Sequence, residues 1–231
     1  DGAILLMGAQ AASDQYQGHQ PLIQCPELSF RGNQVQFEGA KAAAIALRPR
    51  RNCFDNWEHS KVLRCLDLEG NSIRDEGAKV IAAALAPQRN CDGSWAFNMA
   101  LEELWLQDNY IKAEGATALA EALLSPRQDA NGYWRFNTSP LELLLVENYI
   151  GDAGAQAIAA AVEPRKNPDG AWALNHGHST TALHLSHNGI GGVGWQAIAA
   201  ALRPRETPDG GWVCNITVKD LRLGVVAGAQ S

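Results

Sequence analysis

The sequence predicts an α/β solenoid, in which short parallel strands and short helices alternate along one curved stack of repeats. An asparagine recurs at positions 33, 71, 109, 148 and 188, at intervals of 38, 38, 39 and 40 residues. A short run of alternating apolar residues precedes each asparagine, and an alanine-rich segment that ends before a proline follows it. Self-similarity at a nearly fixed period is typical of solenoids, whose repeats each add one unit to a shared core.

Each run before an asparagine predicts one half-buried strand, because residues two apart along a strand face the same side. The five runs are residues 28–30, 66–68, 104–106, 143–145 and 183–185. A sixth run, residues 221–223, lacks the asparagine. We therefore expect one parallel sheet of six strands.

The segment after each asparagine predicts a short helix. A glycine lies six residues on, and alanine-rich sequence with apolar residues at helical spacing follows it. Each segment stops before one of five prolines, which cannot continue a helix: Pro49, Pro87, Pro126, Pro164 and Pro204. The small glycine and alanine side chains let neighbouring helices approach closely.

An insert of about ten residues separates each helix from the next strand, as in residues 88–95 and 165–172. Its Asp-Gly or Asn-Gly pair predicts a short β-hairpin or a compact turn. A tryptophan ends each insert, and we expect these five rings to be mostly buried in a packing ladder, in preference to a ligand platform. They are Trp57, Trp95, Trp134, Trp172 and Trp212.

These motifs resemble the leucine-rich repeat family. Residues 63–71, Leu-Arg-Cys-Leu-Asp-Leu-Glu-Gly-Asn, match its L-x-x-L-x-L-x-x-N pattern in full. The continuation into Ile73, Gly77 and an Ala/Leu helix is similar to the ribonuclease-inhibitor-like subtype, found also in NOD-like receptors and the Ran GTPase-activating protein. The 38–40-residue repeat is longer than that subtype's, and Leu141 lies one residue closer to Asn148 than the pattern requires.

The resemblance covers residues 25–226 and implies a curved horseshoe segment, with the parallel sheet on its concave face and the helices on its convex face. It implies that the five asparagines bond to the backbone of the turns. We expect a leucine-rich repeat domain over residues 25–231, preceded by an N-terminal segment, residues 1–24, in which residues 3–12 form a capping helix. More repeats or another subunit are expected against the apolar C-terminal edge.

The concave face carries the candidate binding site, because its outward positions differ between repeats that otherwise match. An apolar centre, Trp105 with Leu144 and Val146, is surrounded by carboxylates, a composition typical of interface hot spots. A solvated sheet face with scattered apolar residues is the alternative. The predicted partner-binding residues are Asp67, Glu69, Glu103, Trp105, Glu142, Leu144, Val146 and His184.

Composition excludes several other functions. A net charge of −6 disfavours nucleic acid as the partner, and no apolar run is long enough to span a membrane. The sequence has no P-loop, nucleophile elbow or metal-ligand spacing, so we expect no catalytic residue, no cofactor and no metal site, even at the histidines 176, 178, 184 and 187. Five cysteines favour an intracellular protein, with a Cys53–Cys91 disulfide left open, whereas sequons at Asn137 and Asn215 point mildly the other way.

The sequence therefore predicts a non-catalytic protein-interaction or scaffold module that binds a partner through the concave face. The partner should present apolar side chains ringed by Lys or Arg. Two alternatives remain: an architectural subunit of a large assembly held by its edges, and a regulator such as a GTPase activator. The first would use a basic strip formed by Arg50, Arg127, Arg165 and Arg205, although a role at the helix C-termini is the favoured interpretation of these residues.

Overall fold

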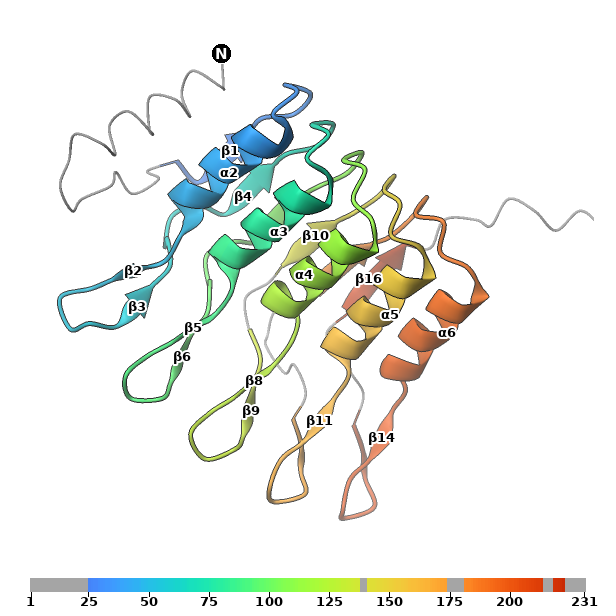
Figure 1. Ribbon diagram of the computed structural model, residues 1–231. Helices are drawn as coiled ribbons and strands as arrows, with labels where there is room; N and C mark the ends of the chain where they lie inside the picture. The colour runs from blue at the N-terminus through green and yellow to red at the C-terminus, as the bar shows by residue number, and fades with distance from the viewer. Residues whose placement is uncertain (1–24, 138–140, 174–180, 214–217, 223–231) are drawn as a thin grey trace, which may run out of the picture.

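The computed structural model describes residues 25–137, 141–173, 181–213 and 218–222. The predicted capping helix in residues 1–24 and the C-terminal edge after residue 222 lie outside the described residues. Within them the chain forms one layered stack, with the sheet on one side and the helices on the other (Figure 1).

The sheet has six parallel strands in chain order: β1 (Glu27–Ser29), β4 (Cys65–Asp67), β7 (Glu103–Trp105), β10 (Glu142–Leu144), β13 (Thr181–His184) and β16 (Val218–Arg222). Equivalent residues of successive repeats pair directly, for example Leu66 with Leu104 and Leu104 with Leu143. The predicted α/β solenoid with a parallel sheet is confirmed.

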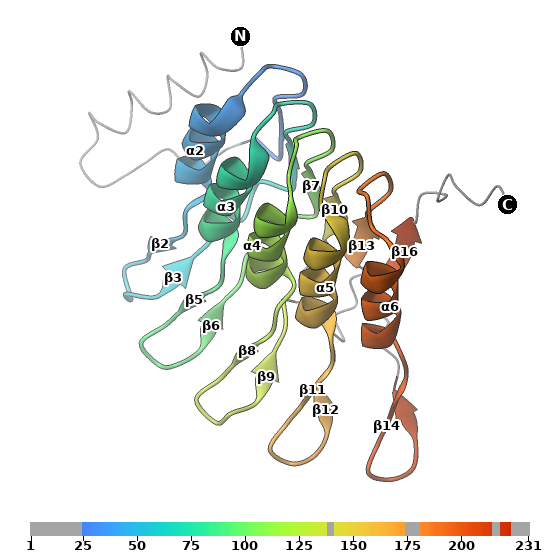
Figure 2. The same cartoon turned by 45° about the vertical axis from the view of Figure 1, so that its right-hand side comes forward.

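In the described ranges, five helices cover one side of the sheet: α2 (Gln36–Leu47), α3 (Arg74–Leu85), α4 (Ala113–Leu123), α5 (Gly151–Val162) and α6 (Gly192–Ala201). Figure 2 shows their arrangement against the strands. Arg48, Ala86 and Glu163, which each precede a proline, have extended ψ angles of 135°, 141° and 133°. This is the geometry that a following proline imposes, and it ends the helix.

The core lies between the sheet and the helices. Leucines from the strand runs are fully buried there, including Leu66, Leu104 and Leu143, and they meet helix residues such as Ile81 and Leu119. Burying such side chains is the main stabilising contribution in a fold of this kind.

Neighbouring helices approach closely at the repeated glycine. A Cβ atom on Gly115 of α4 would lie 3.1 Å from the Ala78 Cβ of α3 and 2.7 Å from a carboxylate oxygen of Asp75. That oxygen accepts hydrogen bonds from the backbone N–H groups of Lys112 and Gly115 at 2.7 and 2.9 Å, so it caps α4 from the preceding repeat. Glycine is thus required for both the packing and the cap.

Each insert forms an antiparallel hairpin. The pairs are β2 (Arg50–Arg51) with β3 (Trp57–Glu58), β5 (Gln88–Arg89) with β6 (Trp95–Ala96), β8 (Arg127–Gln128) with β9 (Trp134–Arg135), β11 (Arg165–Lys166) with β12 (Trp172–Ala173), and β14 (Arg205–Glu206) with β15 (Trp212–Val213). The turn glycine, such as Gly93 with φ of 83°, takes the left-handed conformation that the sequence pair predicts. The Asp92 carboxylate accepts hydrogen bonds from the backbone and hydroxyl of Ser94, which lower its pKa. This carboxylate therefore has a role in the turn.

The tryptophans bridge neighbouring hairpins, but they are less buried than the sequence predicts. Trp95 donates its indole N–H to the Gln128 carbonyl at 2.8 Å, and Trp172 donates to Glu206 at 2.7 Å. Four of the rings are only partly buried and Trp212 is 67% exposed. The prediction of mostly buried rings is wrong: charged side chains lie over three of them, such as Arg51 over Trp57 and Lys166 over Trp172, in place of closely packed apolar groups.

The asparagine ladder is present along the turn edge, where strands lead into helices. Asn109 is fully buried, and its carbonyl oxygen accepts from the N–H groups of Asn71 and Ile73, while its amide donates to the Leu68 and Gln107 carbonyls. Asn71 and Asn148 repeat this pattern toward their own preceding repeats. Asn33 lies at the open end of the described stack and is exposed.

Candidate functional site

The outward-facing strand positions form two straight columns across the sheet. Trp105 pairs with Asp67 on one side and with Leu144 on the other, and Leu144 pairs with His184. Glu103 and Glu142 pair in the adjacent column. The structure therefore brings the strand residues of the predicted site together, and Glu69 and Val146 lie two residues after β4 and β10. We call the whole set the concave patch: Asp67, Glu69, Glu103, Trp105, Glu142, Leu144, Val146 and His184.

Trp105, Leu144 and Val146 are partly buried although they point away from the core. Adjacent strands lie about 4.8 Å apart, so the Trp105 and Leu144 side chains are close neighbours. They offer a continuous apolar surface whose remaining exposure a partner would remove.

Glu103 is held in place by its neighbours. The Trp105 indole N–H donates to a Glu103 carboxylate oxygen at 2.9 Å, which fixes the ring and the carboxylate relative to each other. On the other side of Glu103, burial and the carboxylates of Glu103, Asp67 and Glu27 raise the pKa of the Cys65 thiol to about 12. Cys65 therefore stays a neutral thiol near pH 7 and is a poor nucleophile or metal ligand.

The N-terminal side of the concave patch is already paired within the protein. Ser29 donates its hydroxyl to Asp67 at 2.8 Å, and Arg31 donates to Glu69 at 2.6 Å. Asp67 is only 8% exposed and its second oxygen accepts from the Glu69 backbone N–H. These two carboxylates differ from the free, solvated rim that the sequence predicts, because Ser29 in β1 and Arg31, two residues after β1, donate hydrogen bonds to them.

His184 lies at the C-terminal side of the patch. Its side chain is buried, and its Nε2 atom lies 3.1 Å from a Glu142 carboxylate oxygen, close enough for an ion pair when the imidazole is protonated. Glu142 keeps more than a third of its side-chain surface exposed. It is thus among the carboxylates of the patch that a partner can still reach.

Gln107 is a residue of the concave face that the sequence prediction missed. Its side-chain carbonyl oxygen is buried and has no hydrogen-bond partner. An unsatisfied buried acceptor costs stability, so a donor from a bound partner would be favourable here. The sequence gives one indication of this role, which is that Gln107 lies two residues after Trp105. Glutamine is otherwise common on an exposed sheet face.

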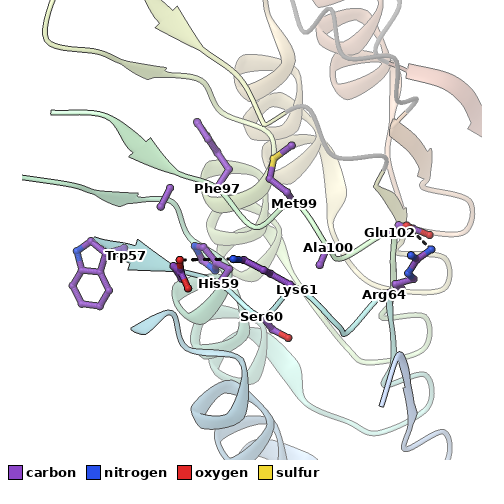
Figure 3. Close-up of a pocket in the computed structure, with 11 residues that line it drawn as sticks. Trp57, His59, Ser60, Lys61, Arg64, Phe97, Met99, Ala100 and Glu102 are labelled. Atoms are coloured by element: carbon purple, nitrogen blue, oxygen red, sulfur yellow. Dashed lines mark ion pairs between the residues drawn. The ribbon is translucent and has the colours of Figure 1, made fainter. Parts of the chain in front are cut away.

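A hollow lies on the hairpin flank, where the chain leads from a hairpin into the next strand. It is a slot of about 340 Å³ between residues 57–64 and residues 96–102, and we call it the flank slot (Figure 3). Phe97 and Met99 supply apolar lining from one segment, and His59 and Lys61 come from the other. Ion pairs lie toward its two ends, Lys61 with Glu58 at 3.7 Å and Arg64 with Glu102 at 3.3 Å.

The arginines after the helix-ending prolines do not form a free basic strip. Arg127, Arg165 and Arg205 donate to carbonyls in the last turns of their own helices, those of Glu121, Ala160 and Ala200. Carbonyls at a helix C-terminus attract cations. The structure thus supports the helix-end role for these three residues.

Other chemistry finds little support within the described residues. Cys25, Cys53, Cys65 and Cys91 are free thiols, and Cys91 contacts Asp55 and Arg51. No group of three or more metal-binding side chains occurs in the described ranges, and none of the helices described there is long and apolar enough to span a membrane. The Asn137 side chain donates to the Asn98 carbonyl, a structural role for this sequon residue.

Comparison with known protein families gives one match. A family model described as Leucine Rich repeat matches residues 59–82, 97–120 and 181–199. Two of these matches begin in the hairpin flank and run through a strand, its turn and most of the following helix. No curated protein matches the chain.

Proposed function

Because the chain is a leucine-rich repeat protein, we propose that it is a non-catalytic interaction module that binds a protein partner through the concave patch. Repeats of this family generally mediate protein–protein interactions, and the family is typically non-enzymatic. The finer features, a ribonuclease-inhibitor-like subtype and one repeat domain over residues 25–231, belong to the same proposal.

The observation that carries the proposal is the pair of Trp105 and Leu144. They are paired in register on adjacent strands, stay partly exposed, and lie next to the paired Glu103 and Glu142. A partly buried tryptophan that is held by a hydrogen bond loses little conformational freedom on binding, which favours affinity.

The partner's chemistry follows from the remaining charges. It should insert an apolar side chain against Trp105 and present Lys or Arg toward Glu142 and Glu103. Asp67 and Glu69 contribute less to binding, because a cation would have to compete with the donors of Ser29 and Arg31. The carboxylates should affect mainly the association rate and selectivity.

Two alternatives have less support. An architectural subunit held by its edges would need the arginine strip, of which Arg127, Arg165 and Arg205 are engaged at helix ends. A GTPase-activating role rests on fold analogy alone, which is weak grounds for an activity.

Photo-crosslinking from defined positions tests the proposal. A photoreactive amino acid at Leu144 should crosslink a specific protein, and the same amino acid at Val193, which is 55% exposed in α6 on the convex side, should not. Equal crosslinking from both positions, or crosslinking from Val193 alone, would show that the concave patch is not the binding surface.

A further inference from the structure

His59 occupies a position where the other repeats have an apolar residue. It lies two residues after Trp57, and the equivalent residues of the later repeats are Phe97, Phe136, Leu174 and Cys214. The next residue also differs, since Ser60 replaces Asn98 and Asn137. This repeat therefore departs from its neighbours at two consecutive positions, and both line the flank slot.

The departure is costly in the unliganded protein. His59 is only 8% exposed, and neither ring nitrogen has a hydrogen-bond partner. Burial lowers the pKa of His59. The nearby Ala96 backbone favours the charged imidazole and opposes this shift only in part, and it does not have the geometry of a hydrogen bond to either ring nitrogen. A buried neutral imidazole thus has one donor and one acceptor unsatisfied, where phenylalanine would have none.

The change from Asn98 to Ser60 weakens the same segment. The Asn98 side chain accepts hydrogen bonds from the backbone N–H groups of Ala100 and Leu101, both at 3.1 Å. Ser60 accepts only one, from Val62, at 3.4 Å. Here two features that favour folding, a satisfied buried side chain and a well-bonded turn, are both lost in one segment without a compensating contact. Such departures are expected at functional sites.

The rest of the flank slot indicates what it would hold. Its volume of about 340 Å³ is at the small end of ligand sites and suits one large side chain with its flanking backbone. Phe97 and the 54% exposed Met99 offer an adaptable apolar wall. Lys61 and Arg64 are already paired with Glu58 and Glu102, so the slot offers no net charge for an ionic ligand.

We infer that the flank slot binds an extended protein segment, with one Leu, Met or Phe side chain against Phe97 and Met99 and its backbone amide against His59. A peptide unit carries one donor and one acceptor, which is what the neutral imidazole lacks. Because both ring nitrogens are covered in the free protein, a small rotation of the ring or of a lining side chain accompanies binding. The inference deepens the proposed function, since Arg64 and Glu102 directly precede the strand residues Cys65 and Glu103 and so join the slot to the concave face.

The test uses the full chain and three small probes: N-acetyl-leucine-N-methylamide, the alanine analogue, and octanoate. Each is titrated while the imidazole nitrogen signals of His59 are followed by NMR. The leucine probe should shift them saturably, and the alanine probe should bind at least tenfold more weakly. An unchanged His59 signal up to the solubility limit, equal binding of both amides, or preferential binding of octanoate would overturn the inference.

Two variants separate a binding role from a packing role. His59→Phe should fold with unchanged or higher stability and bind the leucine probe at least tenfold more weakly; a packing residue would leave binding unchanged or improve it. Met99→Glu should also lose binding, whereas Val193→Glu, at a similarly exposed apolar residue on α6, should not. Trp105→Ala should leave probe binding unchanged, so a failure of the flank slot is distinguishable from a failure of the concave patch.

Discussion

The turn edge and the hairpin flank lie at opposite ends of the same strands and are built differently. At the turn edge, four buried asparagines bond to the repeat before them, with closely similar partners each time. At the hairpin flank, equivalent positions hold His59, Phe97, Phe136, Leu174 and Cys214, and the side-chain hydrogen bonds of Ser60 and Asn98 differ.

The difference separates two roles. Positions that hold the same residue in each repeat, with all of its hydrogen bonds made, stabilise the stack. Each repeat contacts only its neighbours, so every interface between repeats needs the same contacts. Positions that change on that constant frame, on the sheet face and on the hairpin flank, are free to recognise a partner. In the part of the chain that the structure describes, the buried side-chain polar atoms without a hydrogen-bond partner belong to His59, Gln107 and His184, which all lie among the changing positions.

The largest expected effect is at the turn edge. Asn109→Ala removes four hydrogen bonds in a fully buried site and takes the side-chain partner from the N–H groups of Asn71 and Ile73 and from the Leu68 carbonyl, while the Gln107 carbonyl keeps its bond from the Gly70 N–H. We expect a loss of about 3–5 kcal/mol in the free energy of unfolding, measured by urea denaturation. Asn33→Ala, at an exposed and singly bonded member of the same series, should cost below about 1 kcal/mol. Equal losses for the two variants would contradict the ladder's role.

The hairpin tryptophans should have intermediate effects. Trp134 is partly buried and donates its indole N–H to Lys166, so Trp134→Ala should cost about 2 kcal/mol by the same measurement. Trp212 is 67% exposed and serves as the matched control. Trp212→Ala should lower the free energy of unfolding by much less than Trp134→Ala does. A loss for Trp134→Ala as large as that for Asn109→Ala would mean that the hairpins carry as much stability as the turn edge.

The smallest effect concerns pH. Burial lowers the pKa of His59 in the folded protein, so on acidification the unfolded chain binds a proton before the folded one does. The free energy of unfolding should therefore fall as pH drops below about 6.5, by at most ~1.4 kcal/mol per pH unit from this group. His59→Phe should show a shallower decrease over the same range. Identical pH profiles for the two proteins would show that His59 is not held neutral by burial.

Much of the fold was predictable because repetition multiplies weak signals. One Leu-x-Leu-x-x-Asn run says little, but five copies in register predicted the sheet, the helices and the turn edge, and the register of Leu66 with Leu104 confirms this. The burial of the tryptophans was not predictable, because it depends on how neighbouring hairpins pack: four rings are partly buried and Trp212 is 67% exposed. The pairing of Asp67 with Ser29 depends on side-chain conformation across strands, which spacing alone does not reveal.

The flank slot was not predicted, because its signal is a departure from the repeat instead of a motif. His59 and Ser60 stand out only when residues 57–64 are aligned with residues 95–102, and the slot's lining comes from both segments. Whether a position contributes to stability or to partner binding can nevertheless be measured directly, by comparing both quantities in the same variant.

That measurement determines both the partner dissociation constant and the free energy of unfolding for Trp105→Ala and Trp134→Ala, with the partner identified by crosslinking. Trp105→Ala should weaken binding about thirtyfold, which corresponds to about 2 kcal/mol, while its stability stays within about 1 kcal/mol of wild type. Trp134→Ala should lose stability and keep its affinity. Wild-type affinity for Trp105→Ala, or loss of affinity only where stability is also lost, would contradict the assignment of recognition to the concave patch.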